Sequence, residues 1–95
     1  MKLSNQDIRS LRGLAHGLKP VVLVGQHGPT EALLTELEGA LAHHQLIKIR
    51  LRAERDTRKA WTQAILDATG ALAVQAIGQI LVLYRRNPDR PALTF

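Results

Sequence analysis

The sequence predicts a single α/β domain of the α+β two-layer kind, in which helices pack on a four-stranded mixed sheet. Apolar residues recur with helical spacing in three segments and with strand character in four, in the order α-β-α-β-α-β-β. Two strand-helix-strand passages that feed a terminal hairpin imply a sheet with both parallel and antiparallel pairs. A length of 95 residues is enough for one domain with its own hydrophobic core.

The first helix is predicted to begin after Ser4, which is placed to cap it, with Asp7 in the position of a capping box. Gly17 is the expected stop. The segment is amphipathic, because an apolar stripe and a separate basic face both follow the helical period. The stripe is formed by Ile8, Leu11, Leu14 and Ala15, and the basic face by Arg9, Arg12 and His16.

An unbroken apolar run from Val21 to Val24 predicts a short strand buried on both faces, which is typical of parallel pairing. The segment Gly25-Gln26-His27-Gly28 ends this strand, and Pro29 is expected at the first position of the second helix. The buried face of that helix is predicted at Leu33, Leu34, Leu37, Ala40 and Leu41.

Branched aliphatic and cationic residues alternate from Ile47 to Arg52, which predicts a half-buried strand. A third helix is expected from about Asp56 to Thr69, followed by two strands, 72–77 and 80–85, that Gly78-Gln79 joins as a tight hairpin. The domain is expected to span residues 1–86, and the prolines of 87–95 predict a loosely ordered tail. The inward side of the third helix is predicted at Trp61, Ala64, Ile65 and Ala68, with Gly70 just beyond its end.

The charge balance favours a polyanionic partner. Thirteen Lys and Arg against eight Asp and Glu give a net charge of +5, which suits nucleic acid or an anionic membrane surface. The absence of cysteine excludes disulfides and thiolate metal sites and is compatible with a reducing cytoplasm, where we expect the protein to act. No apolar run approaches the ~18 residues of a membrane span, so no membrane association is expected.

The segment Gly25-Gln26-His27-Gly28 is the first candidate site. Amides at the start of a helix have no intrahelical partner, and glycines let a phosphate approach the backbone closely. The spacing resembles the loop with which KH domains clamp a nucleic-acid backbone, although an ordinary strand-to-helix turn has the same pattern. Replacing Gly28 with Asp is expected to weaken binding while leaving the fold intact.

Cationic side chains around this loop are the second candidate feature. The outward face of the strand from Ile47 carries cations alone, which indicates either a binding face or a solvated one. Cations at the start of the third helix oppose its dipole, so a bound anion would relieve the conflict. The predicted RNA-binding residues are Gly25, Gln26, His27, Gly28 and Thr30 with Lys19, Arg9, Arg12, Lys48, Arg50, Arg52, Arg55, Arg58 and Lys59.

Catalysis is not expected. The four histidines show no metal-ligand spacing, and neither serine lies near a His-Asp pattern, so we expect no catalytic residue, metal, cofactor or small-molecule substrate. Only Trp61, Tyr84 and Phe95 are aromatic, which is too few for a surface that stacks several bases. Recognition of backbone and shape in structured RNA is therefore favoured.

Several short motifs occur together along the chain. They are Leu14-Ala15-His16, Leu18-Lys19-Pro20-Val21, Gly25-x-x-Gly28-x-Thr30, His44-Gln45-Leu46-Ile47-Lys48, Val74-Gln75-Ala76-Ile77-Gly78 and Val82-Leu83-Tyr84-Arg85. With this set the chain resembles the CRM domain (chloroplast RNA splicing and ribosome maturation), above all its stand-alone bacterial form, the YhbY family. The likeness runs from about residue 3 to residue 86.

The resemblance implies a fold similar to the C-terminal domain of translation initiation factor three, with an added N-terminal helix. It also implies binding to ribosomal RNA in precursors of the large ribosomal subunit, through the Gly25–Gly28 loop and adjacent cations. Two departures stand out: the loop interior carries no Lys or Arg, and Gln45 stands where an acid is expected.

Other functions remain open on the sequence alone. A small basic α/β domain can also coat double-stranded DNA as an architectural protein. An apolar hairpin edge at Leu81 and Leu83 would suit a protein-interaction module. A phosphate-handling enzyme is disfavoured, because no acid-base residue follows the loop.

Overall fold

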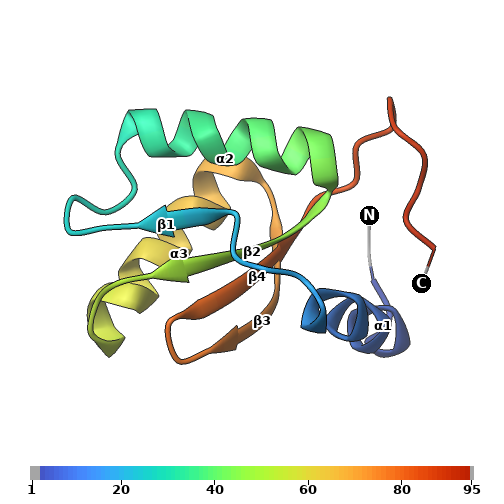
Figure 1. The fold of residues 1–95 in the computed structure, drawn as a ribbon, viewed down its shortest axis with the longest axis horizontal. Coiled ribbons are helices and arrows are strands. Elements are labelled where there is room, and N and C mark those ends of the chain that lie inside the picture. Colours follow the sequence, from blue (N-terminus) through green and yellow to red (C-terminus); the bar gives the residue numbers. More distant parts are fainter. Residues whose placement is uncertain (1–2, 95) are drawn as a thin grey trace.

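The computed structural model describes residues 3–94 and has the predicted order of elements (Figure 1). The helices are α1 (Asn5–His16), α2 (Glu31–His44) and α3 (Arg55–Thr69), and the strands are β1 (Val22–Val24), β2 (Leu46–Leu51), β3 (Leu72–Ile77) and β4 (Ile80–Tyr84). The α+β fold with a four-stranded mixed sheet is thus confirmed. No helix within residues 3–94 has both the length and the apolar character needed to cross a membrane.

The four strands form one sheet in the order β1-β2-β4-β3. β1 pairs with β2 in parallel, with Val24 opposite Leu51, whereas β2 and β3 both run antiparallel to β4. The predicted hairpin at Gly78-Gln79 is present, and Ile77 faces Ile80 across it. Because β1 and β2 are parallel, their carboxyl ends lie at the same end of the sheet. We call this the loop end, since the Gly25–Gly28 loop leaves β1 there.

Two hydrophobic clusters stabilise the fold on opposite faces of the sheet. α2 and α3 pack against one face of the sheet, as predicted, and bury Leu37, Leu41 and Ile65 there. α1 covers part of the other face, where Leu11 and Ala15 pack in the second cluster. The strand residues of the first cluster are Val22, Val24, Ile47, Ile49, Leu51, Leu81 and Leu83, and those of the second are Leu46, Val74, Val82 and Tyr84.

Each helix begins at a side chain that accepts hydrogen bonds from its first turn. The capping box of α1 is confirmed, since Ser4 and Asp7 bond each other's backbone amides at 3.0 Å. α2 begins differently from the prediction: Thr30 caps it by accepting from the amide of Leu33, so Pro29 lies before the helix and not at its first position. The hydroxyl of Thr30 can accept this bond, whereas proline has no side-chain acceptor.

Three burial predictions are wrong for reasons of topology. β1 is an edge strand whose second face α1 does not cover, so Leu23 is 51% exposed and the strand is buried on one face only. Ala64 and Ala68 of α3 are exposed, because the helix turns Ile65 and Thr69 towards the sheet instead. The hairpin edge proposed as a protein-docking site is not available at Leu81 and Leu83 either, because β4 lies between β2 and β3 and both leucines are buried.

The segment after β4 makes defined contacts with the end of α2. Gln45, buried and with a φ of 64°, accepts from the guanidinium of Arg86 and the amide of Asn87 and donates to the carbonyl of Pro91. A carboxylate could not make the last of these bonds, which explains why an amide replaces the expected acid. Leu93 also packs on the second cluster. How mobile residues 87–94 are in solution stays a prediction.

Candidate nucleic-acid interface

Four segments far apart in the sequence meet at the loop end of the sheet (Figure 1). The loop leaves β1 there, and the amide of Arg52 donates to the carbonyl of Val24 at its start, at 3.0 Å. The hairpin tip is tied to the same place, because Leu51 donates to the carbonyl of Gln79 at 2.7 Å. α3 begins three residues after Arg52. The parallel pairing of β1 and β2 therefore brings the loop and the first turns of α3 together.

The loop owes its shape to Gly28 and Trp61. Gly28 has a φ of +67°, in the left-handed region that favours glycine, and its amide donates to the carbonyl of Gly25 at 3.0 Å. A Cβ at Gly28 would lie 2.7 Å from Nε1 of Trp61, so the indole fills the space below the loop. Gly28→Asp is therefore expected to strain the loop as well as add a charge, so weaker binding by this variant would not isolate the effect of the charge. Gly25 has open space around its Cα, and a side chain there is tolerated.

Backbone donors remain available at two places in the loop region. Within residues 3–94, the amides of Gln26 and His27 donate to no acceptor of the chain, and both residues are exposed. The amides of Glu31 and Ala32, in the first turn of α2, are equally without an acceptor in the described chain. Gly28, by contrast, is buried and its amide is already bonded. The exposed middle of the loop, and not its second glycine, is what a phosphate could contact.

Cations are concentrated on one side of this loop. Glu31 and Glu36 are on α2, and Glu36 lines a shallow hollow of about 300 Å³ beside Gly25 and His27. Arg52 and the first turns of α3 lie on the other side. Among the described residues the one ion pair joins Arg85 to Glu38, so the cations near the loop are not held in ion pairs. A polyanion would therefore approach the loop from the side of β2 and α3.

The start of α3 carries its own anion, which the sequence prediction missed. Glu54 is the N-cap, and its carboxylate accepts from the amides of Asp56 and Thr57 at 3.0 and 2.7 Å. The Thr57 hydroxyl also donates to it, and this bond, followed by the two amides, lowers the pKa of Glu54 below its ordinary value. The helix end is thus satisfied without a bound anion. The cations at the start of α3 are therefore not needed to hold an anion at the helix end.

The outward face of β2 has the predicted cations but is not purely polar. Lys48 is half-buried and Arg50 exposed, and Arg50 faces Leu23 of β1 in the sheet register. Arg50 and Leu23, together with Arg52 and the exposed Val21, border a shallow hollow of about 300 Å³. This face adjoins the loop through Arg52. It is therefore continuous with the loop end.

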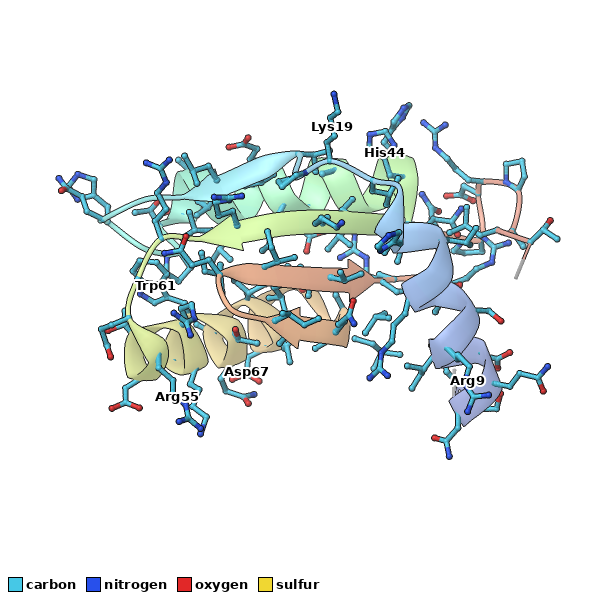
Figure 2. The ribbon with its side chains drawn as sticks, turned by 60° about the horizontal axis from the view of Figure 1, so that its bottom comes forward. Arg9, Lys19, His44, Arg55, Trp61 and Asp67 are labelled. Atoms are coloured by element: carbon cyan, nitrogen blue, oxygen red, sulfur yellow. The ribbon has the colours of Figure 1, made fainter. Side chains whose placement is uncertain are left out.

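Three predicted site residues lie elsewhere. Lys19 precedes β1 and so lies at the opposite end of the strand from the loop, as Figure 2 shows. Arg9 and Arg12 belong to α1, and Arg12 is bonded through Nε to the carbonyl of Val74 at 3.0 Å. Figure 2 places Arg9 at the far end of the molecule from Arg55. A ligand at the loop end would contact these three only if it also wrapped around the sheet.

Similarity to known proteins extends over this whole arrangement. The model of the CRS1/YhbY (CRM) domain matches residues 3–85, and thus includes the loop, β2, α3 and the hairpin. The chain belongs to this family. An RNA-binding protein of Haemophilus influenzae is 50% identical to this CRM domain over 88 residues, covering 92% of this chain and 89% of that protein.

Further relatives agree over the whole CRM domain. A Pseudomonas aeruginosa protein named "probable RNA-binding protein" is 40% identical over 89 residues, covering 93% of this chain and 86% of that one. The solution structure of a hypothetical protein of Staphylococcus aureus superimposes with a TM-score of 0.78 at 30% identity, over 90% of this chain and 91% of that one. The predicted resemblance to the CRM family is thereby confirmed.

Proposed function

We propose that this CRM domain binds structured RNA and holds its sugar-phosphate backbone at the loop end of the sheet. The observation that carries the proposal is the pair of exposed amides at Gln26 and His27, which, within residues 3–94, donate to no acceptor and lie at the end of the sheet where cations are held in no ion pair. Backbone amides bind phosphate oxygens without regard to sequence, and Lys and Arg add the electrostatic attraction. The names of the Haemophilus influenzae and Pseudomonas aeruginosa relatives support RNA as the partner.

The arrangement favours backbone recognition over base stacking along a strand. Trp61 is packed beneath Gly28, and Tyr84 is buried in the second cluster, so neither presents a free ring for bases. The Gln26 and His27 amides would hold one phosphate, and Arg52, Arg55 and Lys59 would neutralise its neighbours along the chain. Such a footprint suits a helical RNA whose phosphates have a fixed spacing.

The setting we propose is assembly of the large ribosomal subunit, with ribosomal RNA in its precursors as the ligand. Crosslinking the protein to RNA in cell extract and sequencing the attached fragments tests this setting. Fragments drawn from large-subunit RNA support it, and fragments without such enrichment reject it. Competition with duplex DNA of equal length at matched salt separates RNA recognition from architectural DNA binding, and structured RNA is expected to win.

The role of the loop is tested by an isosteric charge change. Gln26→Glu places an anion beside the two amides, whereas Gln6→Glu makes the same change on α1, at the other end of the molecule. Both variants lose one unit of net charge, so a general electrostatic effect lowers the affinity of both equally. We expect Gln26→Glu to weaken RNA binding about tenfold more than Gln6→Glu, since its carboxylate would repel the phosphate from the loop amides. Equal affinities would remove the loop from the binding surface.

A further inference from the structure

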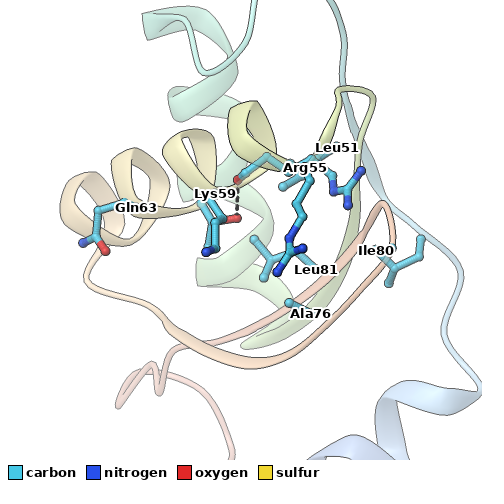
Figure 3. Close-up of a pocket in the computed structure, with 10 residues that line it drawn as sticks. Leu51, Arg55, Lys59, Gln63, Ala76, Ile80 and Leu81 are labelled. Atoms are coloured by element: carbon cyan, nitrogen blue, oxygen red, sulfur yellow. Dashed lines mark hydrogen bonds between the residues drawn. The ribbon is translucent and has the colours of Figure 1, made fainter.

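A cleft separates the first turns of α3 from the β3–β4 hairpin (Figure 3). It has a volume of about 310 Å³, at the lower end of the range for sites that hold small ligands. It opens on the face of α3 that does not carry Trp61, and its far wall is the hairpin. Its lining residues include Arg55, Arg58, Lys59, Gln63, Ala76 and Leu81.

The cleft has an apolar floor and a cationic wall. Leu51, Ala76 and Leu81 form the floor on the sheet side. Figure 3 shows the Arg55 side chain extending from α3 across the cleft towards Leu81 and Ala76. Lys59, one helical turn further on, lines the same wall. None of the lining residues is acidic, so the cleft offers positive charge over a hydrophobic surface.

Arg58 provides a fixed planar group in this wall. Its guanidinium donates to the carbonyl of Ala53 at 2.9 Å, and the residue is half-buried. A planar cation held in one orientation is a surface on which a nucleobase can stack, as bases do on arginine in RNA complexes. Gln63 adds an amide whose nitrogen already donates to Asp67, which leaves its carbonyl oxygen to accept from a base edge.

Arg55 and Lys59 of the cleft form no ion pair among the described residues, whereas Arg58 is attracted to Glu54 and bonded to Ala53. Arg55, Arg58 and Lys59 are spaced by three and four residues, so like charges are neighbours on the helix surface and weaken it. They also lie near the amino end, where the helix dipole opposes positive charge. Glu54 caps the backbone of this turn but does not line the cleft. A negatively charged ligand at the cleft would offset this repulsion.

We propose that the cleft accepts one unpaired nucleotide of the bound RNA. Its base would lie between the Arg58 guanidinium and the aliphatic floor, and its phosphate would contact Arg55 and Lys59. This inference rests on the proposed RNA binding, and it adds a preference for a bulged or looped nucleotide to recognition of the backbone. The loop and the cleft lie on either side of the same two turns of α3, because Trp61 supports the loop and its neighbours line the cleft.

Three RNA hairpins of equal stem length test the inference. One is fully paired, one carries a single bulged nucleotide, and one carries an abasic nucleotide at the same position. The abasic hairpin keeps the backbone charge and the bend, so the ratio of bulged to abasic affinity isolates the base. We expect the protein to bind the bulged hairpin about tenfold more tightly than the abasic one.

Substitutions that fill the cleft, with a matched substitution outside it, test whether the base binds there. Ala76 and Ala73 are both exposed alanines on the same face of β3, but only Ala76 lines the cleft. Ala76→Val and Ala76→Leu are expected to lower the affinity ratio stepwise towards one, whereas Ala73→Leu should keep it. All three changes preserve the net charge and suit a strand, and thermal unfolding followed by circular dichroism checks that each variant folds.

Different outcomes reject the cleft proposal and the proposed RNA binding. Equal affinity of the unmodified protein for bulged and abasic hairpins, or a ratio that Ala76→Leu leaves unchanged, overturns the cleft while RNA binding stands. Failure to bind any of the three hairpins rejects RNA binding itself, and the cleft proposal with it. A ratio lowered equally by Ala76→Leu and Ala73→Leu also overturns the proposal, since the effect would then belong to the strand and not to the cleft.

Discussion

Replacing Gly28 with alanine is the sharpest test of how the loop is built. The residue has a φ of +67°, and an alanine Cβ would lie 2.7, 2.9 and 3.2 Å from three atoms of the Trp61 indole. The left-handed backbone costs an L residue about 1–2 kcal/mol. Forcing an atom into packed space costs about 1–3 kcal/mol more. The free energy of unfolding should therefore fall by about 2–5 kcal/mol, which leaves a typical domain folded but weakened.

Gly70 provides the matched control. Its φ is +70°, and a Cβ there would meet no atom within 4 Å, so Gly70→Ala carries the backbone cost alone. The two variants should differ by about 1–3 kcal/mol, or roughly 5–20 °C in Tm for a domain of this size. Urea unfolding followed by circular dichroism measures both. Combining Gly28→Ala with Trp61→Phe, which has a smaller ring, should recover most of the difference. Equal destabilisation by the two alanines would refute the contact between the loop and Trp61.

Three further predictions concern charge and the C-terminal segment. The slope of log affinity against log salt is expected at roughly −3 to −5. Replacing Lys48 and Arg50 with alanine should make this slope shallower by about one unit for each phosphate that is no longer neutralised. An unaltered slope would show that this face of β2 is a solvated surface. Because hydrogen bonds lower the pKa of Glu54 in the folded protein, its contribution to stability is complete above the ordinary carboxyl pKa of about 4.3 and disappears as the pH falls through the lowered value. The difference in unfolding free energy between the unmodified protein and Glu54→Gln should thus shrink from pH 7 towards pH 3, and a constant difference would contradict the cap. Gln45→Ala removes three hydrogen bonds to the C-terminal segment and should lower the unfolding free energy by roughly 2–3 kcal/mol in urea titrations. Gln79→Ala, at an exposed glutamine, is the control. A loss equal to that of the control would show that these bonds do not stabilise the protein.

The sequence pattern was sufficient for the order of elements because each carries local signals. Ser4 and Asp7 determine where α1 begins, and Gly78-Gln79 determines the hairpin, through contacts between residues close in the chain. The exposure of Leu23 depends instead on which part of the second sheet face α1 covers. Periodicity cannot supply that information, because it depends on how distant segments pack.

The same distinction applies to the candidate site. The Gly25–Gly28 loop is visible in the sequence as a break between a strand and a helix. That Trp61 supports it could not be predicted, because this tryptophan has the spacing of an ordinary core residue. Glu54 had a usable signal, since an acid directly before a helix can cap it. The separation of Lys19 from the loop follows from the direction of β1, whereas the position of Arg9 depends on where α1 packs.

The placement of the chain ends has a practical consequence. Leu3 and Leu93 both pack on the second cluster with Leu11 and Ala15 of α1. Figure 1 shows α1 and the C-terminal segment on the opposite side of the molecule from the loop between β1 and α2. An affinity tag, a fluorophore or a surface linker attached beyond either residue would leave the loop, the cleft and the cationic strand face open to solvent. Immobilised protein should therefore bind ligand as free protein does, which makes single-molecule and surface-based titrations suitable for measuring these interactions.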